Sequence, residues 1–371
     1  MIRKTAFLIF FVLFLAQSTW AALKVGVVLP LSGKDAQAGQ ELQLWITDLS
    51  RYFAKKGVYF ELFFFDSQGN PYRIKKVVEN AFFKRIDVLI GPFTGSCAGP
   101  LVKEAKSLNI PVIITAGEIN PIKFLRNPLG PVFRTGISTR AAVKVLYHCL
   151  QKQGIHRIGL LLTKDPIGQE GEKWLTAYAT EHAIKITKKR YFGVSDTDVS
   201  YHLEQMLDCE AVVCWAPPRS CANVARNVFR QGYKIPIYFP HFVADEPFLR
   251  ENQNLYAFPF VGAAFLTPDK FPGDKNILNL WLTFHSAFGI PYRASFASYA
   301  DALIFLTHAV KKGGYRHWLR ELDKLGLVKG LTGLYFLSTD DHYGLIAPSA
   351  GVFSYDGFNY EAVCKPQRGI F

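Results

Sequence analysis

The sequence predicts an α/β protein made of two doubly wound parallel-sheet lobes that are joined by a multi-crossover hinge. Short apolar segments alternate with amphipathic segments of helical length, which is typical of βαβ units. The apolar segments hold few polar residues, as expected for strands that helices cover on both faces. The same alternation starts again near the middle of the chain. The 371 residues, 49% of them hydrophobic, are enough for two cores of ordinary size.

The first half contains four predicted strands, each followed by a helix or a turn. Predicted strands cover residues 23–30, 58–65, 86–91 and 110–115, and predicted helices cover 36–56, 74–84 and part of 94–107. Breaker residues from Asp66 to Pro71 mark a turn after the second strand.

The second half repeats this pattern. Predicted strands cover residues 156–163, 184–192, 210–215 and 235–239, and predicted helices cover 168–181, 199–207 and 220–231. Residues 267–371 are too few for a third lobe, and they contain predicted helices at 277–288 and 295–311, a strand and turn at 333–341 and a final strand at 351–355. This last part would complete the two lobes, which requires several crossovers. Ligands bind outside the carboxyl ends of strands in such sheets, so we expect a cleft where two sets of strand ends meet.

Residues 1–21 are predicted to be a cleaved signal peptide. Arg3 and Lys4 precede an unbroken apolar run over residues 6–16, and Thr19 and Ala21 are suited to the positions three and one before a cut. The run is shorter than the roughly 20 residues of a membrane span. No cysteine follows the cut, which argues against a lipid anchor. We expect a mature protein that starts at Ala22 in the periplasm.

The charge and the cysteines restrict the partners. The formal charge is +13, and it is +11 once Arg3 and Lys4 are removed. Export argues against nucleic acid as a partner, which leaves a basic solvated surface or attraction of an anionic solute. Disulfides are permitted in an oxidising compartment. The spacing Cys209-x4-Cys214-x6-Cys221 matches no common zinc pattern, so we expect no metal and no cofactor.

Several motifs, in their order and spacing, resemble the leucine/isoleucine/valine-binding family of type I periplasmic solute-binding proteins. The matching pieces are Lys24-Val25-Gly26-Val27, Leu31-Ser32-Gly33, Gly39, Asp66 to Pro71, Val88 to Pro92, Ile110 to Ile114, Asn120-Pro121, Phe133-Arg134-Thr135, Gly168, Gly171, Tyr299 to Ala302 and Gly333 to Phe336. The resemblance implies an N-lobe of residues 22–136 plus 267–328 and a C-lobe of 137–266 plus 329–371. It also implies a monomeric receptor of an ABC importer that closes on a solute and docks onto permease and ATPase subunits on separate chains.

Two N-lobe loops are candidates for the ligand site. Thr94, Gly95 and Ser96 join a strand to a helix, where free N–H groups suit a carboxylate, although simple helix capping explains the same residues. The second loop offers Thr115, Gly117 and Glu118, and Glu118 either accepts a ligand amine or is merely solvated.

The C-lobe candidates are Ile167, Trp215 and His241, which lie at predicted strand ends. Trp215 either stacks on a ligand or belongs to the core. Alignment with the family places Gly95 and Ile119 where a serine and a threonine hold the solute, and Ala38 and Ile167 replace aromatic residues. The acidic partner of the solute's amine falls near His241 or Phe242, so branched-chain amino acids are expected to bind weakly and a larger or aromatic carboxylate better.

Two other functions are compatible with parts of the sequence. A sensory or regulatory ligand-binding protein shares this fold, and fold does not determine function. Gly95-Ser96-Cys97-Ala98-Gly99 has the form of a nucleophile elbow, with His148, His156, His202 or His241 as the base of a hydrolase. Cys97 lies several residues beyond the end of its strand, which disfavours an enzyme. Cys97 is also the only cysteine of the predicted N-lobe, so we expect a free thiol; the pairing of Cys149, Cys209, Cys214, Cys221 and Cys364 stays open.

Overall fold

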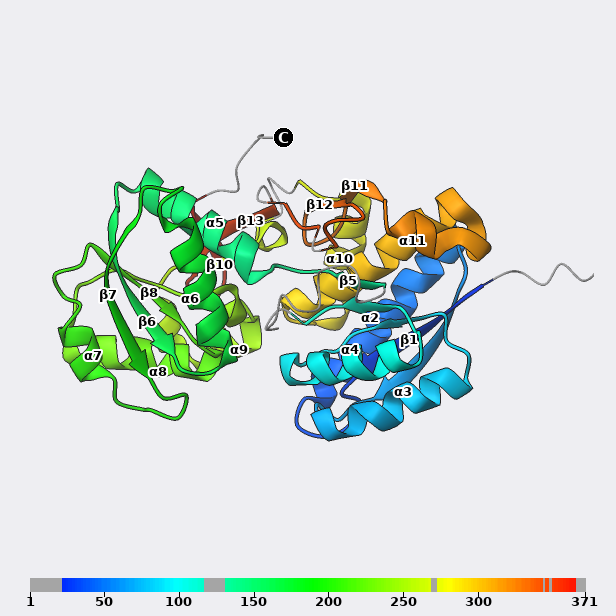
Figure 1. Cartoon of the computed structure of the whole chain (residues 1–371), viewed down its shortest axis with the longest axis horizontal. Helices are drawn as coiled ribbons and strands as arrows, with labels where there is room; N and C mark the ends of the chain where they lie inside the picture. Colours follow the sequence, from blue (N-terminus) through cyan, green and yellow to red (C-terminus); the bar gives the residue numbers. More distant parts are fainter. Residues whose placement is uncertain (1–21, 117–130, 268–271, 343, 347–348, 365–371) are drawn as a thin grey trace, which may run out of the picture.

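The computed structural model describes residues 22–116, 131–267, 272–342, 344–346 and 349–364. Two lobes lie side by side, each built on its own parallel sheet with helices on both faces (Figure 1). The predicted fold class is therefore confirmed. The predicted signal peptide, residues 1–21, and the candidate ligand residues Gly117 and Glu118 lie outside the described residues.

The N-lobe is organised around a five-stranded parallel sheet in the order β2-β1-β3-β4-β5. The strands are β1 (Leu23–Leu29), β2 (Phe60–Asp66), β3 (Val88–Ile90), β4 (Val112–Ile114) and β5 (Val132–Arg134). Helices α3 (Ile74–Phe83) and α4 (Ala98–Ser107), entered through the 3₁₀ turns η1 (Pro71–Arg73) and η2 (Gly95–Cys97), share one core cluster. Helices α2 (Ala36–Ala54), α10 (Lys275–Phe288) and α11 (Ala294–Leu322) share another.

Aromatic packing fixes the late helices against the early one. The rings of Trp45 on α2 and Trp281 on α10 meet edge-on with centroids 5.2 Å apart. The indole of Trp45 also donates a hydrogen bond of 3.1 Å to the carbonyl of Phe296 on α11. A buried indole N–H needs such an acceptor. Residues 275–322 therefore complete the N-lobe although they follow the second sheet in sequence.

The C-lobe has a four-stranded parallel sheet in the order β7-β6-β8-β9. Its strands are β6 (Arg157–Thr163), β7 (Lys185–Phe192), β8 (Ala211–Trp215) and β9 (Ile237–Tyr238). Its helices are α5 (Thr139–Lys152), α6 (Pro166–Ala179), α7 (Ser200–Glu204), α8 (Pro218–Gln231) and α9 (Glu246–Glu251), with 3₁₀ turns η4 (His241–Val243), η5 (Gln253–Leu255) and η6 (Ala264–Leu266). A bridge from Phe239 to Phe260 continues the sheet into antiparallel β10 (Phe260–Ala263), β13 (Ala350–Tyr355) and β14 (Tyr360–Cys364).

The strand predicted at residues 351–355 is confirmed as β13, but the prediction that it is the final strand is wrong. Strand β14 follows β13 and pairs with it antiparallel, and a disulfide from Cys364 to Cys149 attaches β14 to α5. Its sequence alternates polar and apolar residues weakly, and only pairing with β13 supplies its hydrogen bonds. Cys97 is a free thiol, as predicted, and Cys209, Cys214 and Cys221 are also free and buried.

Glycines at equivalent places in the two lobes bring a helix against the end of a strand. A Cβ atom at Gly39, in the first turn of α2, would lie 2.1 Å from the carbonyl oxygen of Pro30. A Cβ atom at Gly168, in the first turn of α6, would lie 1.9 Å from the carbonyl oxygen of Thr163. Both distances are far below van der Waals contact, so only glycine permits this approach. The approach holds both helix starts close to the strand ends that face the other lobe.

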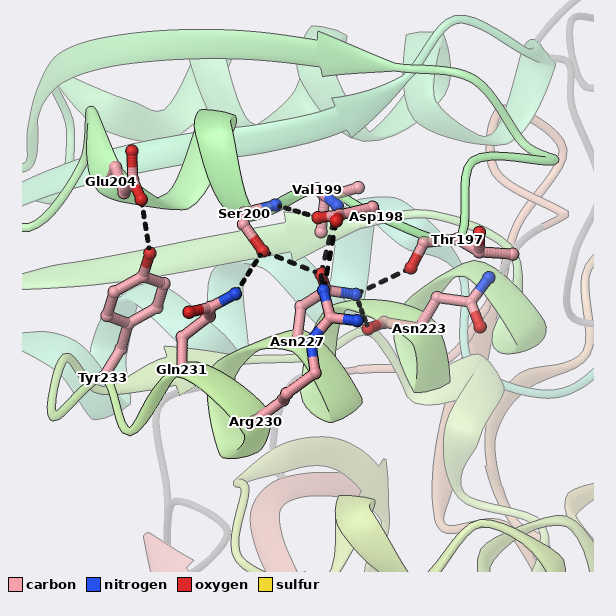
Figure 2. A network of polar contacts seen from close by, with 10 residues as sticks. All are labelled: Thr197, Asp198, Val199, Ser200, Glu204, Asn223, Asn227, Arg230, Gln231 and Tyr233. Carbon is pink, nitrogen blue, oxygen red and sulfur yellow. Dashed lines mark hydrogen bonds and ion pairs between the residues drawn. The ribbon is translucent and has the colours of Figure 1, made fainter.

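A network of polar contacts in the C-lobe centres on Asn227 of α8 (Figure 2). Its side-chain oxygen accepts hydrogen bonds from the backbone N–H of Val199 (3.3 Å) and the hydroxyl of Ser200 (3.0 Å). Its amide group donates to the carbonyls of Thr197 and Asn223, both at 2.8 Å. One buried side chain thus fastens the segment before α7 to α8.

The hairpin of β11 (Gly326–Lys329) and β12 (Leu334–Leu337) is fixed to α11 by a buried carboxylate. Asp301 accepts hydrogen bonds from the backbone N–H groups of Leu331 and Thr332 and from the hydroxyl of Tyr335. The hydroxyl of Tyr335 in turn accepts from the N–H of Gly136 at 3.1 Å. The chain therefore stays beside α11 through β12 and reaches the second sheet at β13.

Among the described residues, no helix is long and apolar enough to cross a membrane.

Candidate functional site

A cavity of about 330 Å³ lies between the lobes. In the first sheet, β2 lies on one side of β1 and β3 on the other, so the strand order reverses between β1 and β3. In the second sheet, β7 and β8 lie on opposite sides of β6, so the order reverses between β6 and β8. Clefts of α/β proteins form outside the carboxyl ends of the strands at such points. The cavity is lined by Asp35, Phe93, Thr94, Thr115, Ala116, Gly136, Ile137, Pro218, His241, Phe242, Ala244, Asp245, Phe248, Gly262, Ala263, Phe265, Leu266, Arg293, Ala294, Ser295, Ser298 and Thr332.

Three of the residues predicted from sequence line this cavity: Thr94, Thr115 and His241. The other predicted residues that the structure describes do not line it. Gly95 and Ser96 lie in η2, and Ile167 packs against the core from the first turn of α6. Trp215 is fully buried at the end of β8.

The N-lobe wall follows β3 and β4. Gly91, directly after β3, has a φ of +139°, and a Cβ atom there would lie 2.9 Å from the carbonyl oxygen of Val28. The hydroxyl of Thr115, directly after β4, donates a 2.9 Å hydrogen bond to the carbonyl of Pro92. The two strand ends are thereby joined, and the chain turns so that Phe93 and Thr94 reach the cavity.

The C-lobe wall is an aromatic cluster. The ring centroids of His241 and Phe242 are 4.2 Å apart, and that of Trp215 is 6.1 Å from Phe242. His241 and Phe242 line the cavity, whereas Trp215 supports them from behind. Of the two interpretations of Trp215, the geometry corresponds to the core residue.

Sequence reasoning missed a partly buried ion pair in the cavity wall. One guanidinium nitrogen of Arg293, Nη1, donates to both carboxylate oxygens of Asp245 at 3.3 and 3.1 Å. Asp245 is also the N-cap of α9, since it accepts a hydrogen bond of 3.1 Å from the N–H of Phe248. Burial raises the pKa of Asp245, and the charge of Arg293 opposes this shift.

Asp245 lies only three residues beyond Phe242, where the sequence alignment had found no acidic group. The sequence Asp245-Glu246-Pro247 is a helix-start signal that marks Asp245 as a cap, and this signal could have drawn attention to the residue. No comparable local signal marks Arg293. It reaches the cavity because its backbone pairs with Asp245 in an isolated antiparallel bridge.

The chemistry of the wall suits a solute with an apolar body and a polar end. Four phenylalanine rings line the cavity, those of Phe93, Phe242, Phe248 and Phe265. The cavity continues into a wider opening of about 910 Å³ that includes Lys34, Arg219, Arg226 and Glu251. With Asp35, Asp245 and Arg293, which line it as well, the opening has four cationic and three acidic residues, a small excess of positive charge.

The sequence profile of the periplasmic binding protein family matches residues 22–349. The chain belongs to this family. The resemblance inferred from the motifs is therefore confirmed, and a comparison with curated protein sequences gives no match.

Solved structures of other binding proteins share the fold of this one. An extracellular ligand-binding receptor from Rhodopseudomonas palustris HaA2 has 20% sequence identity and a TM-score of 0.76, over 92% of this chain and 99% of that one. The leucine-binding protein LivK of Thermotoga maritima is 17% identical with a TM-score of 0.74, over 93% and 99% of the two chains. An ABC-transporter solute-binding protein of R. palustris, solved in complex with benzoate, is 18% identical with a TM-score of 0.72, over 94% and 98%.

In this binding protein, Cys97 lacks the surroundings of a catalytic nucleophile. Its side chain is fully buried, and burial raises the pKa of the thiol. Its hydrogen-bond partner is the hydroxyl of Thr94 at 3.2 Å, not an imidazole. A reactive cysteine needs a lowered pKa and access to solvent. Within the described residues, no group of three or more His, Cys, Asp or Glu side chains could hold a metal ion.

Proposed function

We propose that the protein is the solute-binding receptor of an ABC importer and captures a carboxylate solute between its lobes. The observation that supports this most directly is the cavity itself, which lies where the carboxyl ends of both sheets meet. Membership of the periplasmic binding protein family and the fold shared with ABC-transporter receptors point the same way. The permease and ATPase subunits would be separate chains.

Within this proposal, the solute is a larger or aromatic carboxylate and not a branched-chain amino acid. One structural neighbour is named for leucine and another was solved with benzoate, so the fold accommodates both kinds of solute. In this chain, four phenylalanine rings surround the cavity. Among the described residues, two acidic side chains line the cavity, Asp35 and Asp245, and Asp245 is already paired with Arg293. An unpaired buried ammonium is costly, so a zwitterion is disfavoured.

A thermal-shift screen followed by calorimetric titration tests the proposal. The panel contains leucine, isoleucine, valine, phenylalanine, short peptides, aliphatic acids and aromatic acids, each at neutral pH. We expect stabilisation by at least one aromatic acid and little by leucine. At a solute concentration 100 times its Kd, the stabilisation is about 2.7 kcal/mol. Stabilisation by leucine alone would contradict the assignment of the solute but not that of a receptor.

Solute binding is expected to close the two lobes about crossovers near Gly136 and Leu266 and between β12 and β13. Hinge closure around a ligand is a common transition of two-lobed proteins. Small-angle scattering should give a smaller radius of gyration with saturating solute, and an unchanged radius would argue for a fixed cleft. The lobe boundaries inferred from the sequence, 22–136 plus 267–328 and 137–266 plus 329–371, are part of the same proposal with one change: β12 lies beside α11, so the last crossover falls between β12 and β13 and not at Val328.

We also propose that the mature protein starts at Ala22 in the periplasm. N-terminal sequencing of the periplasmic fraction checks this, and an intact Met1 start would contradict it.

A further inference from the structure

The connection between α10 and α11 places a cation in the cavity wall. Arg293 is the last residue before α11, and its side chain is 16% exposed. Its backbone pairs with that of Asp245, while the N–H of Glu246 donates to the carbonyl of Tyr292 and the N–H of Tyr292 donates to the carboxylate of Glu246. These contacts hold Arg293 in one place between the lobes. It is therefore preorganised and loses little side-chain entropy on binding a ligand.

Most of the hydrogen-bonding capacity of Arg293 is unused. Among the residues that the structure describes, only Nη1 has an acceptor, the carboxylate of Asp245. Nε is buried and has no acceptor among the described residues, and no hydrogen bond from Nη2 to a described residue is formed either. A buried charged donor without an acceptor is unfavourable, so such an atom in a cavity wall indicates a missing partner. Nε and Nη2 form one edge of the guanidinium, which is the edge that matches the two oxygens of a carboxylate.

The first turn of α11 adds to the attraction of an anion. Ala294 and Ser295, the first two residues of this helix, line the same cavity as Arg293. The helix continues to Gly314 before its geometry is interrupted. Amide groups at the start of a long helix carry partial positive charge, and here they lie beside a guanidinium with free donors.

We infer that Arg293, assisted by the start of α11, binds the carboxylate of the solute, while the phenylalanine rings hold an aromatic body. This inference rests on the proposed receptor function and names the site within it. The anion site predicted from the sequence was the start of the helix after β3, at Thr94 to Ser96. Gly95 and Ser96 do not line the cavity, whereas Arg293 does.

Asp245 has a defined part in this arrangement. Its carboxylate accepts hydrogen bonds from Arg293 and from the N–H of Phe248 in the first turn of α9, so it is the counter-ion of Arg293. A solute carboxylate on the other edge of Arg293 places a second negative charge near Asp245. Removal of the charge of Asp245 should therefore strengthen the binding of a carboxylate. If Asp245 instead held the amine of a zwitterion, the same change would weaken binding.

The test uses three acid and amide pairs: benzoate and benzamide, 4-hydroxybenzoate and 4-hydroxybenzamide, and 3-phenylpropionate and 3-phenylpropionamide. Isothermal titration of the full mature protein should show one of the acids bound at least about tenfold more tightly than its amide, because the amide lacks the charge-assisted bonds. Arg293→Gln should weaken that acid about 10- to 100-fold and leave the amide nearly unchanged. Arg293→Lys, which keeps the charge but not the planar edge, should give an intermediate loss.

Two further variants separate binding from folding. Asp245→Asn keeps a good helix cap and should bind the acid several-fold more tightly. The Asp245→Asn/Arg293→Gln double variant contains no unpaired buried charge, so it should fold and still lose the acid. Arg320→Gln is the matched control. Arg320 pairs with Glu321 near the far end of α11, its side chain is 68% exposed, and it does not line the cavity, so acid binding should not change.

The outcomes are distinguishable. Retention of acid affinity within threefold by a folded Arg293→Gln or double variant would overturn the inference, and so would weaker acid binding by Asp245→Asn. Binding of amides or other uncharged solutes but of no acid would overturn it while the receptor function stands. Binding of no solute in either panel would overturn both.

Discussion

Asn227→Ala should destabilise the C-lobe, because this side chain makes the hydrogen bonds that join α8 to Thr197, Val199 and Ser200 (Figure 2). The substitution leaves the N–H of Val199 without an acceptor, and Val199 is 1% exposed. A buried donor without a partner costs about 1–3 kcal/mol. The bond to the carbonyl of Thr197 contributes about 1 kcal/mol more, and the carbonyl can then turn to water. We expect a loss of about 2–3 kcal/mol in the free energy of unfolding.

Asn223→Ala is the matched control for this prediction. Asn223 lies one turn earlier on α8 and donates a 3.1 Å hydrogen bond to the carbonyl of Asp196 at the surface. Both substitutions gain the same helix propensity, so their difference isolates the buried network. Urea unfolding at 25 °C measures both. A difference below about 0.5 kcal/mol between the variants would refute the reasoning, since surface changes have effects of that size.

Three other predictions concern separate features of the fold. Burial raises the pKa of Glu170 to about 7, so the native state keeps a proton that the unfolded state releases above about pH 4.5, and the free energy of unfolding falls as the pH rises between those values. Glu170→Gln should therefore become more stable than the wild type by up to about 3 kcal/mol between pH 4.5 and 8, and equal pH profiles of stability would contradict this. Reduction of the Cys149–Cys364 disulfide, whose residues are 215 positions apart, should lower the free energy of unfolding by up to about 5 kcal/mol, and denaturation with and without reductant measures the loss. Gly171→Ala would place a Cβ atom 2.2 Å from the indole of buried Trp215, so a destabilisation of about 1–3 kcal/mol is expected in urea unfolding, and wild-type stability would show that the helix can move away.

The layout of the two sheets could be predicted from local sequence because buried parallel strands are continuous apolar runs. The runs in β1, β6 and β8 are unmistakable and stand close to their predicted positions. Strands β5 and β10, of three and four residues, and the polar strand β14 lack such a signal. They are strands only because a neighbouring strand supplies their hydrogen bonds. Helix α5 has an apolar face and was simply not recognised.

The candidate site was only partly accessible to the same reasoning. Thr94, Thr115 and His241 follow strands directly, so the rule that ligands bind at strand ends led to them. Trp215 also follows that rule but is turned into the core. Phe248, Phe265 and Arg293 reach the cavity from segments that do not follow a parallel strand of either sheet, so the rule gave no reason to consider them.

The sequence by itself determined the α/β class, the doubling of the lobes and the family, because these depend on local composition and periodicity. Only the tertiary structure decided which charges face the cavity. Asp245 and Arg293 are 48 residues apart, and they meet because the chain between them leaves the C-lobe, forms α10 in the N-lobe and returns past the cleft. A contact of this kind depends on how two lobes pack, and neither local segment contains that information.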